Sequence, residues 1–371
     1  MVTILKISAV GCGGISGTHI INILKHKDAQ LVSAADIVFE RAEKVFNETG
    51  AKAYKSLDEL LEGEKPDVLH ICTPHYLHVP MALKAMSMGI HVLIEKPCAV
   101  TLEQLKALRE AQRETGLHVG VCFQNRYNAS TIRLEEILKD TEANGRLIGA
   151  RGFVTWHRTK EYYADDWHGK RDKECGGVLI NQAIHTLDLI GRFAGGFTAV
   201  TGTTSNDHLK GVIEVEDTVS ALLEFTGGAQ GVFYATTASA ADYPVFSEFK
   251  CENATYRLEG DNLFQIHRDG RIETLKPYEE KEYTGKMCWG TGHEALINDF
   301  YASVIDDRPF FIDAFEGGKA TVWGTIGGVL LLSLAYTLVL LGGLSYHWQL
   351  VVRGGIIIGA VTLYALTRSR R

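Results

Sequence analysis

Short apolar runs alternate with amphipathic segments along the first 125 residues of the chain. The apolar runs, which often contain Val or Ile, lie at 5–10, 31–36, 68–73, 91–95 and 119–123. Between them, apolar residues recur at helical spacing over 15–25, 40–48, 79–88 and 102–115. This alternation predicts a doubly wound parallel sheet, which binds ligands at the carboxyl ends of its strands.

The pattern changes after a helix predicted at 131–141. Polar and apolar residues then alternate in the manner of half-buried strands. These strands are predicted at 151–155, 200–204, 218–225, 231–235, 246–250, 256–259 and 263–267. Their short connections favour an open-faced, mainly antiparallel sheet, with a long helix predicted at 179–193 on its other face. The sequence therefore predicts two domains, at 1–125 and 126–320.

The C-terminal segment 321–371 has a different character. No Asp, Glu, Lys or Arg occurs from position 320 to position 352, and after Arg353 the chain is uncharged again up to Thr367. Spanning a bilayer takes about 20 apolar residues, which 322–344 meets and 348–366 nearly meets. The segment predicts a transmembrane hairpin over 322–366 that anchors a cytoplasmic protein, with a buried helix pair as the alternative.

Composition limits the class of protein. The chain has 371 residues, a net charge of −7 and 22% charged residues, which indicates neither a nucleic-acid-binding stripe nor a disordered acidic tail. Its 7 cysteines are scattered and form no CxxC pair. This pattern is typical of reduced thiols in the cytoplasm and predicts neither a disulfide scaffold nor a metal site.

A glycine-rich turn follows the first predicted strand. Gly11 allows a tight turn, while Gly13 lets a pyrophosphate approach the backbone amides at the start of the helix that Ile15 opens. Asp36 ends the second strand, where its carboxylate can accept both ribose hydroxyls of a dinucleotide. Since no Lys or Arg directly follows Asp36, NAD is favoured over NADP. A plain strand–turn–helix with a capping Asp is the alternative.

A lysine and a histidine stand where both could act on one substrate. Lys96 ends an apolar strand and precedes Pro97, a position that can present its ammonium to a developing alkoxide at the sheet edge. His185 lies on the predicted long helix, with Asn181 and Asp188 at helical spacing on the same face. A surface lysine and a core histidine are the alternatives.

Several separated motifs resemble the glucose–fructose oxidoreductase/inositol dehydrogenase (Gfo/Idh/MocA) family over about residues 3–320. They are Gly11-Cys12-Gly13-Gly14-Ile15 with His19, Cys72-Thr73-Pro74 with His78, Glu95-Lys96-Pro97, Gly176-Gly177, and His185-Thr186-Leu187-Asp188. The resemblance implies a Rossmann domain with a doubly wound parallel sheet, followed by an α+β domain with an open-faced sheet. It also implies that Lys96 and His185 are the catalytic residues.

The resemblance assigns further residues to two ligands. Cofactor binding is implied for Gly11, Gly13, Gly14, Ile15, Asp36, Thr73, Pro74, His78, Glu95 and Lys96. A sugar pocket is implied for Arg126, Tyr127, Arg158, Tyr162, Tyr163, Trp167, His168 and Asp188. Many members carry Asp where this chain has Asn181, whose neutral amide would orient the catalytic histidine by hydrogen bonding without adding charge.

These observations predict an NAD-dependent oxidoreductase that moves hydride between nicotinamide and a secondary hydroxyl of a sugar, cyclitol or sugar derivative. An NAD-assisted glycosidase of the same family and a non-catalytic, membrane-attached NAD(H) sensor are the alternatives. The open sheet predicts a homo-oligomer. Residues 345–354 resemble the end of a bacterial sugar ABC-transporter permease, which favours a fusion of two coding regions over a native membrane tether.

Overall fold

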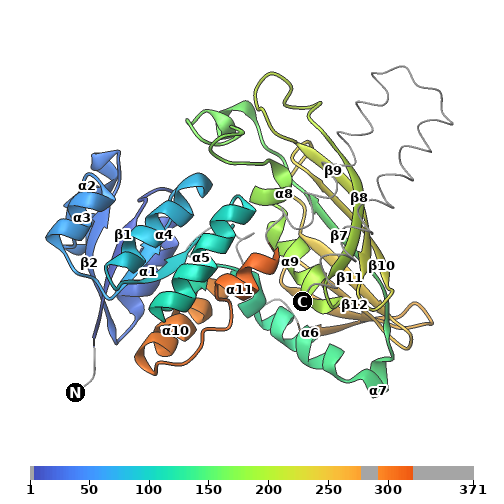
Figure 1. Cartoon of the computed structure of the whole chain (residues 1–371). Coiled ribbons are helices and arrows are strands. Elements are labelled where there is room, and N and C mark those ends of the chain that lie inside the picture. The colour runs from blue at the N-terminus through green and yellow to red at the C-terminus, as the bar shows by residue number, and fades with distance from the viewer. Residues whose placement is uncertain (1–3, 277–290, 321–371) are drawn as a thin grey trace, which may run out of the picture.

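Six parallel strands form the first sheet, in the order β3-β2-β1-β4-β5-β6 (Figure 1). The structure, a computed structural model, describes residues 4–276 and 291–320. The strands are β1 (Leu5–Val10), β2 (Ala29–Ala35), β3 (Lys52–Tyr54), β4 (Val68–Ile71), β5 (His91–Ile94) and β6 (Val119–Val121). The helices between them are α1 (Ser16–Lys25), α2 (Phe39–Thr49), α3 (Leu57–Gly63), η1 (His75–Leu77), α4 (His78–Ser87) and α5 (Leu102–Thr115). The predicted doubly wound sheet is confirmed, and the elements that the sequence pattern does not predict are β3, α3 and η1.

Capping residues set where the helices of this sheet begin and end. The Thr101 side chain accepts a hydrogen bond from the Gln104 N–H at the start of α5, as an N-cap residue does. Gly116 ends the same helix in the left-handed region, at a φ of +69°. The cap at Thr101 thereby fixes how the chain leaves the carboxyl end of β5, where Lys96 lies.

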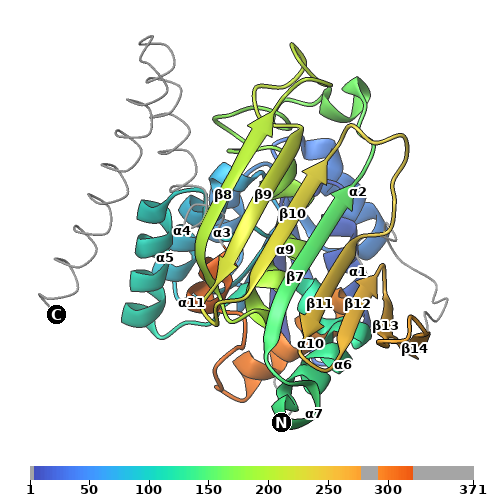
Figure 2. The same ribbon diagram turned by 90° about the vertical axis from the view of Figure 1, so that its right-hand side faces the viewer.

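Eight strands form the second sheet, in the order β14-β13-β12-β11-β7-β10-β9-β8. They are β7 (Leu147–Thr155), β8 (Phe197–Ser205), β9 (Thr218–Phe225), β10 (Gln230–Thr236), β11 (Phe246–Cys251), β12 (Thr255–Glu259), β13 (Asn262–Ile266) and β14 (Ile272–Lys276). Every neighbouring pair is antiparallel except β7 with β10. In Figure 2 the sheet turns one face to the viewer, and no helix of the described part lies over that face. The predicted open-faced, mainly antiparallel sheet is thus present, with one parallel pair.

Short helices connect the two sheets. They are η2 (Gln124–Tyr127), α6 (Ala129–Lys139) and α7 (Thr141–Asn144), whereas η3 (Lys160–Tyr163) follows β7 of the second sheet. The single long helix predicted at 179–193 is wrong, because two helices lie there, α8 (Val178–Asn181) and α9 (Ile184–Phe193). The N–H groups of Gly177 and Leu179 both donate to the Glu216 side chain and hold the start of α8. Since the helix is interrupted after α8, the helical spacing between Asn181 and His185 is lost.

The chain returns to the first sheet after completing the second. α10 (Gly292–Ile305) packs against α1, while α11 (Ala314–Gly317) packs against α5 and β6 and is followed by η5 (Gly318–Ala320). The Val121 N–H donates to the Ile312 oxygen at 2.9 Å, and Arg109 donates to the oxygens of Ala314 and Phe315. The sequence predicts one second domain at 126–320, whereas these contacts tie its last residues to the first sheet.

The predicted membrane hairpin at 322–366 lies outside the described residues. Within residues 4–276 and 291–320, no helix is both long enough and apolar enough to cross a bilayer. The two helices of the hairpin therefore stay a prediction.

Candidate active site

A cavity of about 1310 Å³ lies at the carboxyl ends of β1, β2, β4 and β5. The first sheet contributes the turn at 10–17 and the segments that follow these strands. The part of the chain after β6 contributes side chains between 156 and 168 and residues of α8 and α9, and these two helices lie between the two sheets in Figure 1. Segments far apart in the sequence therefore face one space.

The glycine turn forms one end of this cavity. Gly11 has a φ of +85°, and a Cβ there would lie 2.7 Å from the carbonyl carbon and oxygen of Cys72. Backbone conformation and space thus both require glycine at this position. A Cβ on Gly13 or Gly14 would meet no atom within 4 Å, so the backbone there is open to the cavity. An open backbone at the start of α1 fits a pyrophosphate.

Asp36 lies beside the turn, and its carboxylate is held by backbone donors. Oδ2 accepts the Cys12 N–H at 2.7 Å, and Oδ1 accepts the Val38 N–H at 2.8 Å. An ionised carboxylate has acceptor capacity beyond these two bonds, so ribose hydroxyls can also bind to it. The acceptor set at this end of the cavity fits NAD.

The other residues predicted to bind the cofactor line the same cavity. They are Ile15, Thr73, Pro74, His78, Glu95 and Lys96. The ring nitrogens of His78 lie 2.8 Å from the main-chain oxygens of Thr73 and Pro97. The structure thus brings this whole predicted set together, and the individual roles stay predictions.

Lys96 reaches from the end of β5 to α8. Its Nζ donates to the Asn181 main-chain oxygen at 2.8 Å and lies 3.5 Å from Asn181 Oδ1. The Asn181 side-chain N–H donates to Glu174. The prediction that Asn181 orients His185 is wrong, because the interruption after α8 directs the Asn181 amide to Lys96 and Glu174.

His185 lines the cavity together with Lys96. Its Nε2 lies 3.3 Å from the Gln124 side-chain nitrogen, and its ring packs edge-on against Phe123. Burial, followed by the positive charge of Lys96, lowers the pKa of His185 to about 3. The imidazole is therefore neutral at neutral pH, which is the form a general base needs.

A buried carboxyl group that the sequence pattern does not single out lies behind Lys96 and Asn181. Glu174 is 1% exposed, and it accepts hydrogen bonds from the Gly169 N–H and from the Asn181 amide. Burial raises the pKa of Glu174 to about 8, against the opposing effect of these hydrogen bonds and of the Lys96 charge. Because Glu174 takes the N–H of the amide, it leaves Oδ1 of Asn181 facing Lys96.

Replacing Glu174 with Gln should remove a pH-dependent step from the rate profile. Since the pKa of Glu174 is about 8, its carboxylate form gains population as the pH rises through that value and then holds the amide most strongly. We expect wild-type kcat/KM to rise through this range, and Glu174→Gln to be flat and about tenfold lower above it. Steady-state rates on both sides of the step test this, with the exposed Glu161→Gln as a control that keeps it. A step that persists in Glu174→Gln contradicts the assignment.

Aromatic and polar side chains line the cavity near α8. Four of the predicted sugar-pocket residues are among them: Arg158, Tyr162, Trp167 and His168. Two further residues, which the sequence pattern does not single out, are Trp156 and Gln182. The Arg158 guanidinium lies 5.0 Å from the centre of the Trp156 ring and 5.2 Å from that of Tyr162. It also donates to Asp242 at 2.9 Å. Ring faces beside hydrogen-bonding groups suit a ligand with an apolar face and several hydroxyls.

The other four predicted sugar-pocket residues have partners within the protein, and their assignment as substrate contacts stays a prediction. Arg126 and Asp188 form a buried, two-pronged ion pair with distances of 2.7 and 2.5 Å. Tyr127 donates its hydroxyl to Asp299 at 2.6 Å. Tyr163 is buried in a small apolar cluster with Leu209, Ile213 and Val215. These side chains join elements of the fold and do not line the cavity.

Two family models match the chain. The model described as "Oxidoreductase family, NAD-binding Rossmann fold" matches residues 5–123, and the "GFO/IDH/MocA C-terminal domain" matches residues 133–257. The chain belongs to the Gfo/Idh/MocA family. This Gfo/Idh/MocA protein is therefore an oxidoreductase, and its cofactor is NAD.

Curated and structural relatives extend over half or more of this Gfo/Idh/MocA chain. The D-glucoside 3-dehydrogenase of Escherichia coli is 26% identical over 339 residues, which cover 85% of this chain and 91% of that protein. The WlbA dehydrogenase of Bordetella pertussis, solved with NADH and UDP-GlcNAcA, is 28% identical with a TM-score of 0.76 and covers 88% of this chain and 95% of its own. The glucose-6-phosphate 3-dehydrogenase of Bacillus subtilis is 27% identical over 50% of this chain and 52% of that protein. The family models end at residue 257 and these relatives are dehydrogenases, so they give the permease resemblance of 345–354 no support.

Proposed function

We propose that this protein oxidises a secondary hydroxyl of a sugar, cyclitol or sugar derivative with NAD. The observation that carries the proposal is that Lys96 and His185, from distant parts of the chain, line the same cavity as the glycine turn. The names of relatives support the substrate class, since they specify dehydrogenases of D-glucosides, inositol and levoglucosan.

The residues divide the work of an alcohol oxidation. Bound NAD supplies the hydride acceptor. The neutral His185 imidazole takes the proton of the substrate hydroxyl, while Lys96 donates a hydrogen bond to the oxygen as negative charge develops there. Asn181 holds Lys96 in place through its main-chain oxygen, 2.8 Å from Nζ. The balance is one ketone and one proton formed, with two electrons leaving as hydride.

A substrate panel read by NADH absorbance tests the proposal. Polyols, free aldoses, glycosides and nucleotide sugars are offered to the full chain with NAD, and we expect stoichiometric NADH from at least one class. Glycoside cleavage without net NADH would instead identify the glycosidase chemistry. NADH binding with no turnover of any compound would contradict the proposal and favour the sensor.

We also propose that the open face of the second sheet is the contact of a homo-oligomer. Leu222 of β9 and Val232 of β10 pair across the two strands, and their side chains are 61% and 41% exposed. They border a shallow hollow that Glu248 and Lys250 also line. Adjacent exposed apolar side chains on an uncovered sheet are typical of a protein contact surface.

Charging this pair should weaken self-association. We expect the double variant Leu222→Lys, Val232→Lys to show a lower mass than the wild type in size-exclusion chromatography with light scattering, because like charges would meet at the contact. Ile272→Lys, which alters a 56% exposed side chain on the edge strand β14, is the matched control. A wild type that is monomeric at micromolar concentration contradicts the oligomer.

A further inference from the structure

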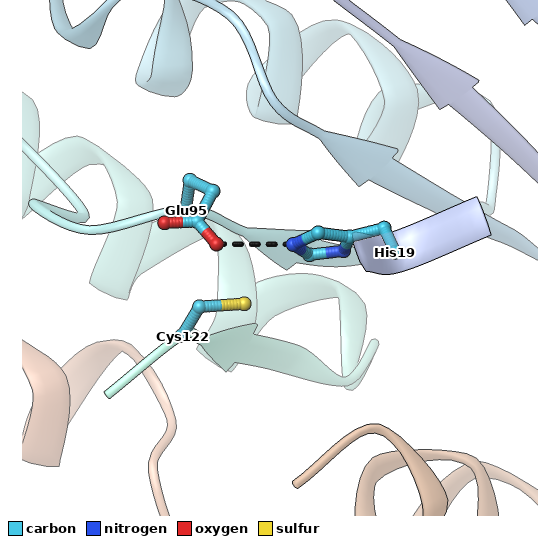
Figure 3. Close-up of side chains that lie close together, drawn as sticks. All are labelled: His19, Glu95 and Cys122. Atoms are coloured by element: carbon cyan, nitrogen blue, oxygen red, sulfur yellow. Dashed lines mark hydrogen bonds and ion pairs between the residues drawn. The ribbon is translucent and has the colours of Figure 1, made fainter. Parts of the chain in front are cut away.

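A chain of hydrogen bonds runs through the interior from α10 to the cavity wall. Tyr301 Oη lies 2.8 Å from His70 Nε2, and His70 Nδ1 lies 2.8 Å from His19 Nδ1. His19 Nε2 then lies 3.0 Å from Glu95 Oε1. Figure 3 shows the Glu95 carboxylate turned toward the His19 ring. Helix α10, strand β4, helix α1 and the end of β5 are thus joined through side chains.

Burial excludes water from this chain of hydrogen bonds. His19, His70 and Tyr301 are 0% exposed and Glu95 is 6% exposed, so water does not replace these bonds. An ionised carboxylate only accepts hydrogen bonds, which makes His19 Nε2 a donor. Against the opposing effect of burial, the pKa of His19 is raised well above its ordinary value, so both of its ring nitrogens carry protons and Nδ1 donates to His70 Nδ1. His70 then donates through Nε2 to the Tyr301 hydroxyl, so His19 donates toward Glu95 on one side and toward His70 on the other.

Glu95 stands at the boundary between this chain and the cavity. Its Oε2 accepts the Lys96 N–H at 3.2 Å, and the residue lines the cavity. Burial by itself would raise the pKa of Glu95, but the hydrogen bond and charge of His19, with the charges of His293 and Lys96, hold it well below its usual range. A negative charge therefore lies in the wall beside Lys96.

We propose that the chain Tyr301–His70–His19 positions Glu95 as an ionised carboxylate at the nicotinamide end of the cavity, and that it thereby favours oxidised over reduced cofactor. The nicotinamide ring is cationic in NAD⁺ and neutral in NADH. A carboxylate beside it stabilises the first form and not the second. His19 is a positioning residue because it acts through Glu95. This inference rests on the proposed function only for where the nicotinamide lies.

The same place in the fold presents three potential metal ligands. Atoms of His19, Glu95 and Cys122 lie within 4.8 Å of one another. Figure 3 shows the three side chains close together. Hydrogen bonds of ordinary length already engage both ring nitrogens of His19. Burial raises the pKa of Cys122 to about 12, which keeps the thiol protonated. The hydrogen bonds of His19 therefore explain, without a bound metal, why His19, Glu95 and Cys122 lie close together.

Two amide replacements of His19 separate positioning from simple packing. The amide of Asn reaches the place of Nδ1 and loses the bond to Glu95, whereas the amide of Gln reaches the place of Nε2 and keeps it. We expect His19→Asn to raise the Kd for NAD⁺ relative to that for NADH by about tenfold, because without the His19 bond burial raises the pKa of Glu95 and favours its uncharged form. His19→Gln should restore most of the wild-type ratio. Glu95→Gln, which removes the charge itself, should shift the ratio furthest.

Cofactor binding is measured by titration calorimetry on the folded full chain, without substrate. His91→Gln is the control, since His91 is a partly buried histidine away from the cavity. Equal ratios in wild type and Glu95→Gln overturn the proposal, and this readout holds even if His19→Asn fails to fold. One equivalent of bound metal per chain also overturns it. The binding measurement involves no turnover of substrate. A failure of this proposal can therefore be distinguished from a negative result in the substrate panel.

Discussion

Replacing Lys96 with Met should lower kcat by about 10²–10³-fold, the range found when one donor to a developing oxyanion is removed. Methionine keeps much of the side-chain length and apolar stem while removing the ammonium that lies 2.8 Å from the Asn181 oxygen. Since the lost hydrogen bond is strongest to the developing alkoxide, kcat should fall more than KM rises. Steady-state kinetics with the best substrate of the panel measures both.

Lys84→Met is the matched control for Lys96→Met. Lys84 also lines the cavity, but its Nζ pairs with Asp58 at 2.5 Å near the helices of the first sheet. We expect its loss to change kcat by less than about twofold, because exposed ion pairs contribute little. Equal losses of kcat in Lys96→Met and Lys84→Met would contradict the catalytic role of Lys96.

The cofactor end of the site could be predicted because parallel strands place their ends together. Gly11, Asp36, Thr73 and Lys96 each follow a different strand, and a doubly wound sheet brings such positions to one edge. Periodicity therefore located these residues without any knowledge of tertiary contacts. The same reasoning could not find β3, which is only 3 residues long and shows no measurable period.

The substrate end could not be predicted to the same depth. Asn181 and His185 keep helical spacing in the sequence, but the contacts that Glu216 makes at the start of α8 are long-range and leave no local signal. Arg126 and Asp188 are likewise residue types that often bind ligands, and only the fold shows that they pair with each other. Glu174 resembles an exposed loop carboxylate until burial is known.

Long-range return of the chain explains a further difference. The segment from α10 to η5 follows the second sheet in sequence but packs against the first, and it supplies Tyr301 to the interior there. Neither the composition of this segment nor its helical periodicity indicates whether it packs against the first or the second sheet. Tertiary contacts alone decide which sheet it covers.

Replacing His185 with Gln should lower kcat/KM by about 10²–10⁴-fold, the usual contribution of a general base. Glutamine keeps a polar side chain of similar reach but has no basic nitrogen. Because burial and then Lys96 lower the pKa of His185 to about 3, the wild-type base is unprotonated through the neutral range. We therefore expect the wild-type kcat/KM to show no loss from imidazole protonation near its ordinary value of about 6.5.

His185→Gln should also be more resistant to acid than the wild type. Neither a purely catalytic nor a purely structural role of His185 would produce both lost turnover and this resistance. Between an unfolded pKa of about 6.5 and the folded value of about 3, the unfolded chain binds the His185 proton and the folded protein does not. Wild-type stability therefore falls as the pH drops through this window, and His185→Gln lacks that part of the fall. Urea unfolding at neutral pH and near pH 4, with the partly exposed His267→Gln as control, measures the difference. A variant that loses turnover yet shows the wild-type acid sensitivity would mean that His185 is not held neutral by the fold.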